Sequence, residues 1–160
     1  MQFTQSMSYP GTVDEVVTMY LTPDYLERRF GRFVVEGSTT VSVEGERVSY
    51  AGTVRPELIP AAATRFVKSD LRVTFTEEWT LNEAEATSRT SVTVDGAPVS
   101  VEATSTLTPS DAGSAREVSG NLSVRVPLLG GRIEKEAVAR VGRLTENEQA
   151  SAAQWLEEHR

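Results

Sequence analysis

The chain has 160 residues, no cysteine, one histidine and a formal net charge of −7. A chain of this length is expected to build one core, so we expect a single domain over residues 1–160, and the lack of cysteine excludes disulfides, thiolate nucleophiles and cysteine-based metal sites. The only histidine, His159, argues against a Ser-His-Asp triad or a histidine-rich zinc site, and the acidic balance without a Lys/Arg cluster argues against nucleic acid as a partner.

The beginning of the chain predicts a strand followed by two short helices. Apolar and polar residues alternate over residues 1–9, which is typical of a half-buried strand. Pro10-Gly11 ends this strand, and Thr12 followed by Glu15 predicts a capping box that opens a helix. Pro23 begins a second short helix, whose apolar side carries Tyr25, Leu26 and Phe30.

Val- and Thr-rich alternating segments in the middle of the chain predict an antiparallel sheet. Asp95-Gly96 is typical of a tight hairpin, because glycine readily adopts the positive φ that such a turn needs. The segment Pro56–Ser69, which contains two prolines, is either a loop or a short helical excursion over the sheet. Six strands are predicted here: Phe33–Val43, Arg47–Arg55, Leu71–Leu81, Ala86–Val94, Val99–Leu107 and Glu117–Val126.

The end of the chain predicts one long helix from Leu128 to Arg160. Apolar residues recur there at three- and four-residue steps, and Trp155 and Leu156 continue the series, so we expect both to be at least partly buried. The alternative is a kink near Gly142, with a capping box of Thr145 and Glu148 restarting the helix. The helix's acidic residues are predicted to form a solvated face: Glu134, Glu136, Glu146, Glu148, Glu157 and Glu158.

Three short patterns resemble the START-like or SRPBCC superfamily, which includes birch-pollen-allergen-like proteins and polyketide cyclases. They are Phe3 with Tyr9-Pro10-Gly11-Thr12-Val13-Asp14-Glu15-Val16, then Thr22-Pro23-Asp24-Tyr25, and finally Val126-Pro127-Leu128-Leu129-Gly130-Gly131-Arg132-Ile133-Glu134. The last pattern is similar to an actinobacterial subgroup described as a domain of unknown function, DUF2505. The resemblance covers essentially the whole chain.

The resemblance implies an α+β helix-grip fold. In this fold a seven-stranded curved antiparallel sheet wraps around a long C-terminal helix, and two short helices lie between strands 1 and 2. It also implies a hydrophobic cavity between sheet and helix, used for lipids, sterols, polyketides or plant hormones. This functional implication is an analogy, because a fold does not fix a function.

Small or hydroxylated residues on the inward stripes, such as Gly52, Ser88, Thr90 and Ser105, predict unfilled volume between sheet and helix. Either a ligand occupies this volume, or larger side chains fill it and leave a dry core. Candidate cavity residues are Met7, Tyr50, Phe75, Glu77, Trp79, Thr90, Ala103, Gly120, Leu122, Ile133, Ala137 and Val141.

Glu77 is the one acidic residue on an otherwise apolar stripe, between Phe75 and Trp79. Buried without a partner, its carboxyl would have a raised pKa and could act as a general acid or base or anchor a ligand. The alternative is a solvated position beside Glu78. Gln5 is a further candidate for a polar contact in the cavity.

Arg28, Arg29 and Arg32 form the densest positive group of the sequence, in a region that the resembling fold places near the cavity mouth. They could attract an anionic head group or carboxylate. The alternative is that these side chains are solvated and lie at the C-terminal end of the second helix, where the helix dipole stabilises positive charges.

We expect a non-catalytic protein that binds a small hydrophobic molecule of the lipid, polyketide or quinone class, without a metal or a cofactor. The alternatives are a cyclase- or hydratase-type enzyme that uses Glu77 as general acid or base, and a protein-interaction module. The first residues lack the basic and apolar regions of a signal peptide, and no run of about 18 apolar residues is present. We therefore expect a soluble, cytoplasmic protein without integral membrane association; the sequence leaves its oligomeric state open.

Overall fold

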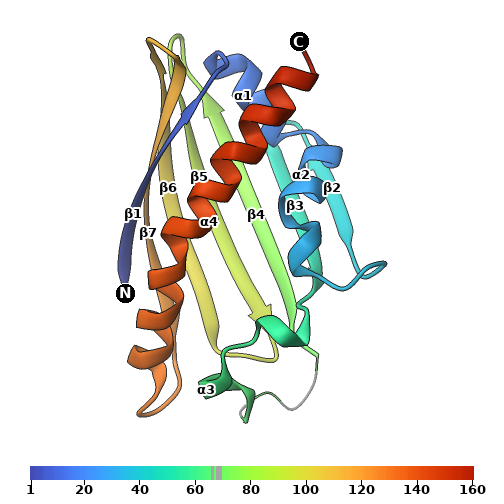
Figure 1. Cartoon of the computed structure of the whole chain (residues 1–160), viewed down its shortest axis with the longest axis vertical. Coiled ribbons are helices and arrows are strands. Elements are labelled where there is room, and N and C mark those ends of the chain that lie inside the picture. The colour runs from blue at the N-terminus through green and yellow to red at the C-terminus, as the bar shows by residue number, and fades with distance from the viewer. Residues whose placement is uncertain (66, 68–69) are drawn as a thin grey trace.

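Seven antiparallel strands form one sheet in the computed structural model, which describes residues 1–65, 67 and 70–160 (Figure 1). The strand order is β1-β7-β6-β5-β4-β3-β2, so the first strand of the chain pairs with the last. The remaining neighbours are consecutive in sequence and form a meander. The strands are β1 (Gln2–Tyr9), β2 (Thr40–Glu44), β3 (Arg47–Thr53), β4 (Arg72–Leu81), β5 (Ala86–Asp95), β6 (Val99–Ser110) and β7 (Gly113–Val124).

The helices lie on one face of this sheet. α1 (Val13–Tyr20) and α2 (Pro23–Phe30) follow β1, and α4 (Gly130–Glu158) runs diagonally across the sheet to the C-terminus (Figure 1). The predicted capping box is present: the Glu15 backbone N–H donates to Thr12 Oγ1 at 3.2 Å, and the Thr12 N–H donates to Glu15 Oε1 at 3.0 Å. This arrangement confirms the helix-grip α+β fold.

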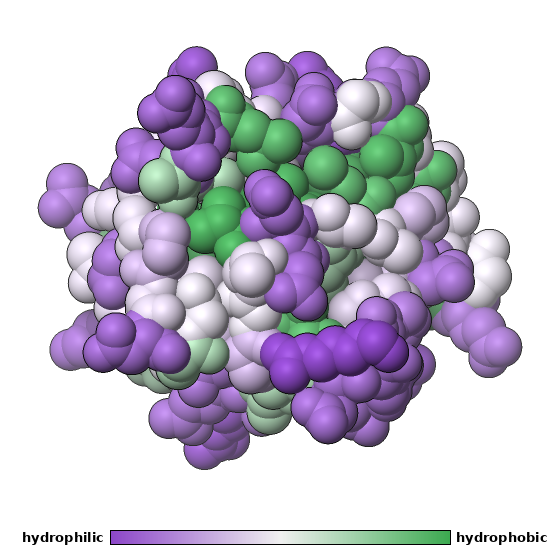
Figure 2. Space-filling view, turned by 90° about the horizontal axis from the view of Figure 1, so that it is seen from above, coloured by the Kyte–Doolittle hydropathy of each residue, from purple (hydrophilic) through white to green (hydrophobic). Residues whose placement is uncertain are grey.

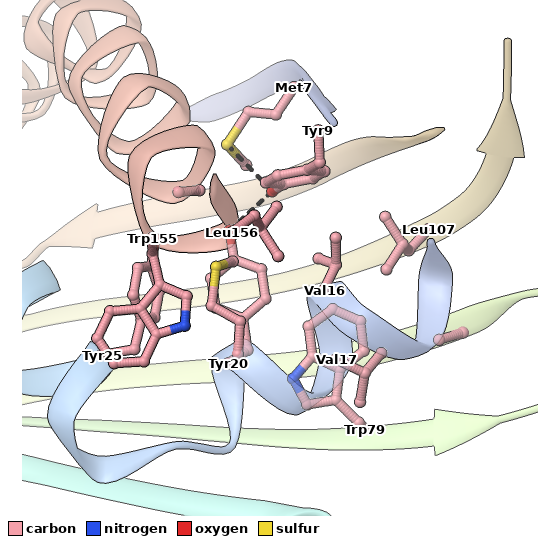
Figure 3. Close-up of a cluster of buried hydrophobic side chains, with 13 residues drawn as sticks. Met7, Tyr9, Val16, Val17, Tyr20, Tyr25, Trp79, Leu107, Trp155 and Leu156 are labelled. Atoms are coloured by element: carbon pink, nitrogen blue, oxygen red, sulfur yellow. Dashed lines mark hydrogen bonds between the residues drawn. The ribbon is translucent and has the colours of Figure 1, made fainter. Parts of the chain in front are cut away.

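The apolar core is divided into two clusters. The larger one joins β1, α1, α2 and the end of α4 through Tyr9, Tyr20, Tyr25, Trp79 and Trp155 (Figure 3). The rings contact one another edge to face or stacked, with Tyr25 and Trp155 centroids 5.4 Å apart. The smaller cluster lies between α2 and the β2–β4 side of the sheet and consists of Leu26, Val34, Val48, Tyr50 and Phe75.

The predicted strand Phe33–Val43 is wrong over most of its length, because β2 begins only at Thr40. Gly31–Phe33 is instead a 3-10 helix (η1), and Gly37 adopts a φ of 81°, in the left-handed region. Ser38 closes a turn there, since its hydroxyl and its backbone N–H both donate to the Val35 carbonyl. The turn leaves only an isolated bridge between Val34 and Val54 upstream of β2.

The start of the last strand needs correction, whereas the prediction of one long C-terminal helix is confirmed. β7 begins at Gly113 rather than Glu117, because the β6–β7 hairpin turns tightly at residues 111–112. α4 is continuous through Gly142, so the helix does not restart with a capping box at Thr145. The segment Pro56–Ser69 contains the 3-10 helix η2 (Pro56–Leu58) and α3 (Ala61–Thr64), and its residues 66, 68 and 69 lie outside the described residues.

In the described part of the chain, no helix combines the length and the apolar character that a membrane crossing requires.

Candidate functional site

A cavity of about 180 Å³ lies between the sheet and the middle of α4; we call it the inner cavity. Its walls combine apolar side chains from β1, β6, β7 and α4 with four charged groups. The lining residues are Phe3, Gln5, Met7, Arg29, Glu77, Thr90, Val101, Ala103, Arg116, Val118, Val141, Leu144, Thr145 and Glu148.

The four charged residues Arg29, Glu77, Arg116 and Glu148 form a chain of ion pairs, which we call the charge network. Glu77 Oε2 accepts from Arg116 Nη2 at 2.8 Å, and Glu77 Oε1 lies 3.9 Å from Arg29 Nη1. Arg29 Nε contacts Glu148 Oε1 at 2.7 Å. The network therefore ties β4 and β7 of the sheet to α2 and α4.

Glu77 is 1% exposed and has hydrogen-bond partners on both oxygens. Trp79 Nε1 donates to Oε1 at 3.1 Å, and Thr90 Oγ1 donates to Oε2 at 2.8 Å. Burial alone would raise the pKa of this carboxyl, but the Arg116 and Arg29 guanidinium groups outweigh it and hold the pKa below its ordinary value. The expected rise in pKa is therefore wrong, because Glu77 is buried with partners.

Arg116 is 2% exposed, and hydroxyl groups hold most of its guanidinium. Nε donates to Ser105 Oγ at 2.9 Å and Nη2 to Ser88 Oγ at 3.1 Å, while the two serine hydroxyls lie 2.6 Å apart. The guanidinium also packs over the Tyr20 and Trp79 rings, at 4.9 and 4.8 Å from the centroids. Its Nη1 is buried and has no hydrogen-bond partner among the described residues.

Arg29 and Glu148 separate the inner cavity from a second pocket between α2 and α4, the outer pocket, of about 190 Å³. Both residues and Leu144 line the two spaces. Tyr20 donates to Glu148 at 3.1 Å and shares a 2.7 Å hydrogen bond with Tyr9, which links the partition to the aromatic cluster (Figure 3). Burial raises the pKa of both tyrosines, so they remain neutral phenols at neutral pH.

Five of the twelve candidate cavity residues line the inner cavity: Met7, Glu77, Thr90, Ala103 and Val141. The structure places the others in packed surroundings or beside the cavity. Tyr50 and Phe75 belong to the smaller core cluster, and Trp79 belongs to the larger one. Ile133 is buried, while Leu122 and Ala137 are half-buried, and none of these three lines the cavity.

Side chains fill much of the volume that the small residues were expected to leave. A Cβ on Gly120 would lie 2.5 Å from Phe3 Cζ, so the Phe3 ring occupies that space. A Cβ on Gly52 would lie 2.9 Å from Val34 Cγ1. Ser88 and Ser105 hold Arg116. The inner cavity is what remains between these filled regions.

The sequence reasoning missed three residues of the charge network: Arg116, Arg29 and Glu148. Arg116 has the inward parity of Val118 and Gly120, but the predicted strand began one residue after it. Glu148 was assigned to a solvated face, whereas its side chain is 18% exposed. Arg29 was interpreted either as part of a positive group near the cavity mouth or as a solvated side chain, and its side chain is 12% exposed. Both stand at helical spacing from buried residues, Arg29 after Tyr25 and Leu26, and Glu148 before Ala152 and Trp155, which is the signal that could have identified them.

An open antiparallel sheet that holds a long C-terminal helix is the helix-grip fold of START-like, or SRPBCC, proteins. Solved structures agree over 99% of this chain. TTHA0849 from Thermus thermophilus has a TM-score of 0.64 at 15% identity, with 99% of its own chain covered. Ara h 8.0201 has a TM-score of 0.58 at 11% identity, with 98% covered. The di-domain ARO/CYC StfQ from the steffimycin biosynthetic pathway has a TM-score of 0.62 at 11% identity, with 51% covered.

The chain belongs to the DUF2505 family, described as "Protein of unknown function", whose model matches residues 4–156. Uncharacterized protein Rv0481c of Mycobacterium tuberculosis is 28% identical over 166 residues, covering 96% of this chain and 95% of that protein. Uncharacterized protein Mb0491c of Mycobacterium bovis matches to the same extent.

Proposed function

We propose that the protein binds a small, uncharged hydrophobic molecule in the inner cavity, with a hydrogen-bond acceptor of the ligand facing Arg116. The observation that carries this proposal is the buried Arg116 Nη1, which has no acceptor among the described residues although its side chain lines a cavity with apolar walls. Buried donors are normally satisfied, so an acceptor supplied by a ligand would complete the site.

The charges of the cavity favour an uncharged ligand. Its lining contains two arginines and two glutamates, and each carboxylate already contacts a guanidinium. A carboxylate ligand would leave an excess negative charge in a buried site, which is costly. A carbonyl group can accept a hydrogen bond without adding charge.

The volume sets the size of the ligand. A dry, enclosed cavity of about 150 Å³ in another protein holds benzene, and the inner cavity, which is partly open to solvent, measures about 180 Å³. A compound with one ring and a short polar substituent therefore fits. The polyketide, sterol or lipid ligands suggested by the fold analogy would need further space, such as that of the outer pocket.

This geometry supports binding more than acid–base catalysis by Glu77. An effective general acid or base has a pKa near the working pH. Glu77 instead has a lowered pKa and fixed partners on both oxygens, so it acts as a permanent counter-ion for Arg116. The ARO/CYC title of one structural neighbour remains a statement about that protein.

A protein-interaction role has less support. The large hydrophobic residues that are exposed in the described part of the chain are scattered over several elements, for example Val43, Leu58, Leu81 and Leu128. Figure 2 shows, at one end of the molecule, a narrow band of hydrophobic side chains bordered by hydrophilic ones. A docking face usually needs a larger contiguous apolar patch.

The proposal is tested first by native mass spectrometry of freshly purified protein, with organic extraction of any bound compound. We then expect acetophenone, which is uncharged and carries one carbonyl, to bind and to raise the melting temperature with the logarithm of its concentration above Kd. Val141→Phe, which fills the cavity, should abolish this binding. Ala139→Phe adds the same ring at an exposed position of α4 and serves as the matched control. Equal acetophenone binding by both variants would refute the inner cavity as the site.

A further inference from the structure

The outer pocket has a different chemical character from the inner cavity. It lies between α2 and η1 on one side and α4 on the other, and Phe30, Phe33 and Leu144 form apolar parts of its wall. Arg28, Arg29 and Arg32 also line it, against one carboxylate, Glu148.

The partners of these arginines leave one positive charge in excess. Arg29 is paired with Glu148 inside the pocket, and Arg28 Nη2 contacts Glu158 Oε2, outside the lining, at 3.0 Å. Arg32 has no carboxylate within ion-pair distance among the described residues and packs over the Phe33 ring at 4.8 Å. The pocket therefore matches a ligand with a single negative charge.

Two buried donors of the pocket lack an acceptor. The Tyr25 side chain is 0% exposed, and its hydroxyl has no hydrogen-bond partner in the part of the chain that the structure describes. Arg29 Nη1 is also buried without a hydrogen bond among the described residues, and Glu77 Oε1 lies 3.9 Å from it, at ion-pair distance. Tyr25, on α2, packs edge to face against Trp155 of α4 (Figure 3) and is one of the residues that line the pocket. Carboxylate oxygens are acceptors that suit both a phenol and a guanidinium.

We propose that the outer pocket binds a small monocarboxylic acid with an apolar body. The carboxylate lies against the Tyr25 hydroxyl and the Arg29 and Arg32 guanidinium groups, and the body packs on Phe30, Phe33 and Leu144. This is a second site beside the inner cavity, and it does not depend on what the inner cavity binds. The volume of about 190 Å³ again corresponds to a single ring with one substituent.

The test uses benzoate, its uncharged isostere benzamide, phenyl phosphate and inorganic phosphate at neutral pH, with binding followed by NMR titration of the Trp155 indole signal. We expect benzoate to bind at least about tenfold more tightly than the other three. Benzamide binding as tightly as benzoate would overturn the proposal, and tighter binding of either phosphate would overturn the assignment to carboxylates.

Two variants locate the site. Tyr25→Phe removes only the hydroxyl, which has no partner to lose, so the melting temperature should not fall while benzoate binding weakens about tenfold. Arg32→Gln should also weaken binding, whereas Arg140→Gln on the exposed side of α4 should not. Unchanged affinity in Tyr25→Phe would refute the site. Val141→Phe should still bind benzoate, so failure of the inner-cavity proposal remains distinguishable from failure here.

Discussion

Glu77 shows how a carboxylate can occupy the inward face of a β-sheet. Its burial has a large desolvation cost, which good geometry with Arg116 and three further polar contacts offsets. Such a pair adds little net stability compared with an apolar pair of the same volume, but removing one member leaves the other charge uncompensated.

We therefore predict that Arg116→Met lowers the free energy of unfolding by about 3–5 kcal/mol, because Glu77 loses its nearest counter-ion in a buried site. The control is Arg47→Met on the outer face, whose pair with Glu78 is more than half exposed and should cost less than about 1 kcal/mol. Urea denaturation measures both. The double variant Arg116→Met with Glu77→Leu should recover most of the loss, and failure to do so would contradict the assigned pairing.

The lowered pKa of Glu77 predicts a pH dependence of stability. Because the pKa is lower in the folded protein than in the unfolded chain, the ionised carboxylate stabilises the fold above the ordinary glutamate pKa, and this contribution is lost as the pH falls toward the folded value. We expect wild type to exceed Glu77→Gln in free energy of unfolding by a constant amount between about pH 5 and 8, and by less below about pH 4. A constant difference down to pH 3 would contradict the shift.

For single residues, the sequence predicts the face of the sheet on which a side chain lies better than it predicts the partners of that side chain. Alternation placed Glu77, Phe75 and Trp79 inward, and the structure agrees. The ion-pair partners of Glu77 are Arg116 and Arg29, which lie 39 and 48 residues away from it in the sequence. The periodicity of one segment carries no information on such distant pairings. Glu77 could therefore be placed on the inward face, but Arg116 and Arg29 could not be identified as its partners.

Helix α4 holds the architecture together through its last turns. Ala152, Trp155 and Leu156 are buried against α1 and α2, and Gln149 Oε1 accepts from the Ser8 backbone N–H at 2.8 Å. The first half of the helix has fewer buried residues, and the middle of the helix covers the inner cavity.

We predict that deletion of residues 149–160 lowers the melting temperature by well over five degrees, since the loss of one buried Trp side chain alone costs about 3–5 kcal/mol. Deletion of residues 159–160, which are exposed, is the control and should change it little. Differential scanning calorimetry measures both. An unchanged midpoint in the longer deletion would mean that these turns do not contribute to the core.

The helices and strands were predicted accurately where the pattern of apolar residues was regular over a long segment, and inaccurately at local turns. The 29-residue α4 and strands β4 to β6 were placed within a few residues of their observed bounds. The apolar run before β2 has β-type composition, yet Gly37 and Ser38 turn the chain there. A turn of this kind is decided by one glycine conformation, which alternation does not detect.

For the whole molecule, the two pockets share the Arg29–Glu148 wall, so their occupancies should be linked. A carboxylate in the outer pocket competes with Glu148 for Arg29 and alters the wall of the inner cavity. We predict that saturating benzoate changes the Kd of acetophenone, and that acetophenone changes the Kd of benzoate by the same factor, as thermodynamic linkage requires. Titrations of each compound in the presence and absence of the other measure both factors. If neither compound changes the Kd of the other, the shared wall does not respond to binding.

The pairing of β1 with β7 affects the order in which the strands of the sheet can pair during folding. Gln2 lies opposite Asn121, and the N-terminal amine donates to the Leu122 carbonyl at 2.6 Å, so the edge of the sheet joins segments about 120 residues apart. Contacts of such separation form slowly. At about 5–20 residues per second of synthesis, β1 leaves the ribosome roughly 5 to 20 seconds before its only neighbour in the sheet exists. Although β1 is synthesised long before β7, it is thus among the last strands of this sheet to pair.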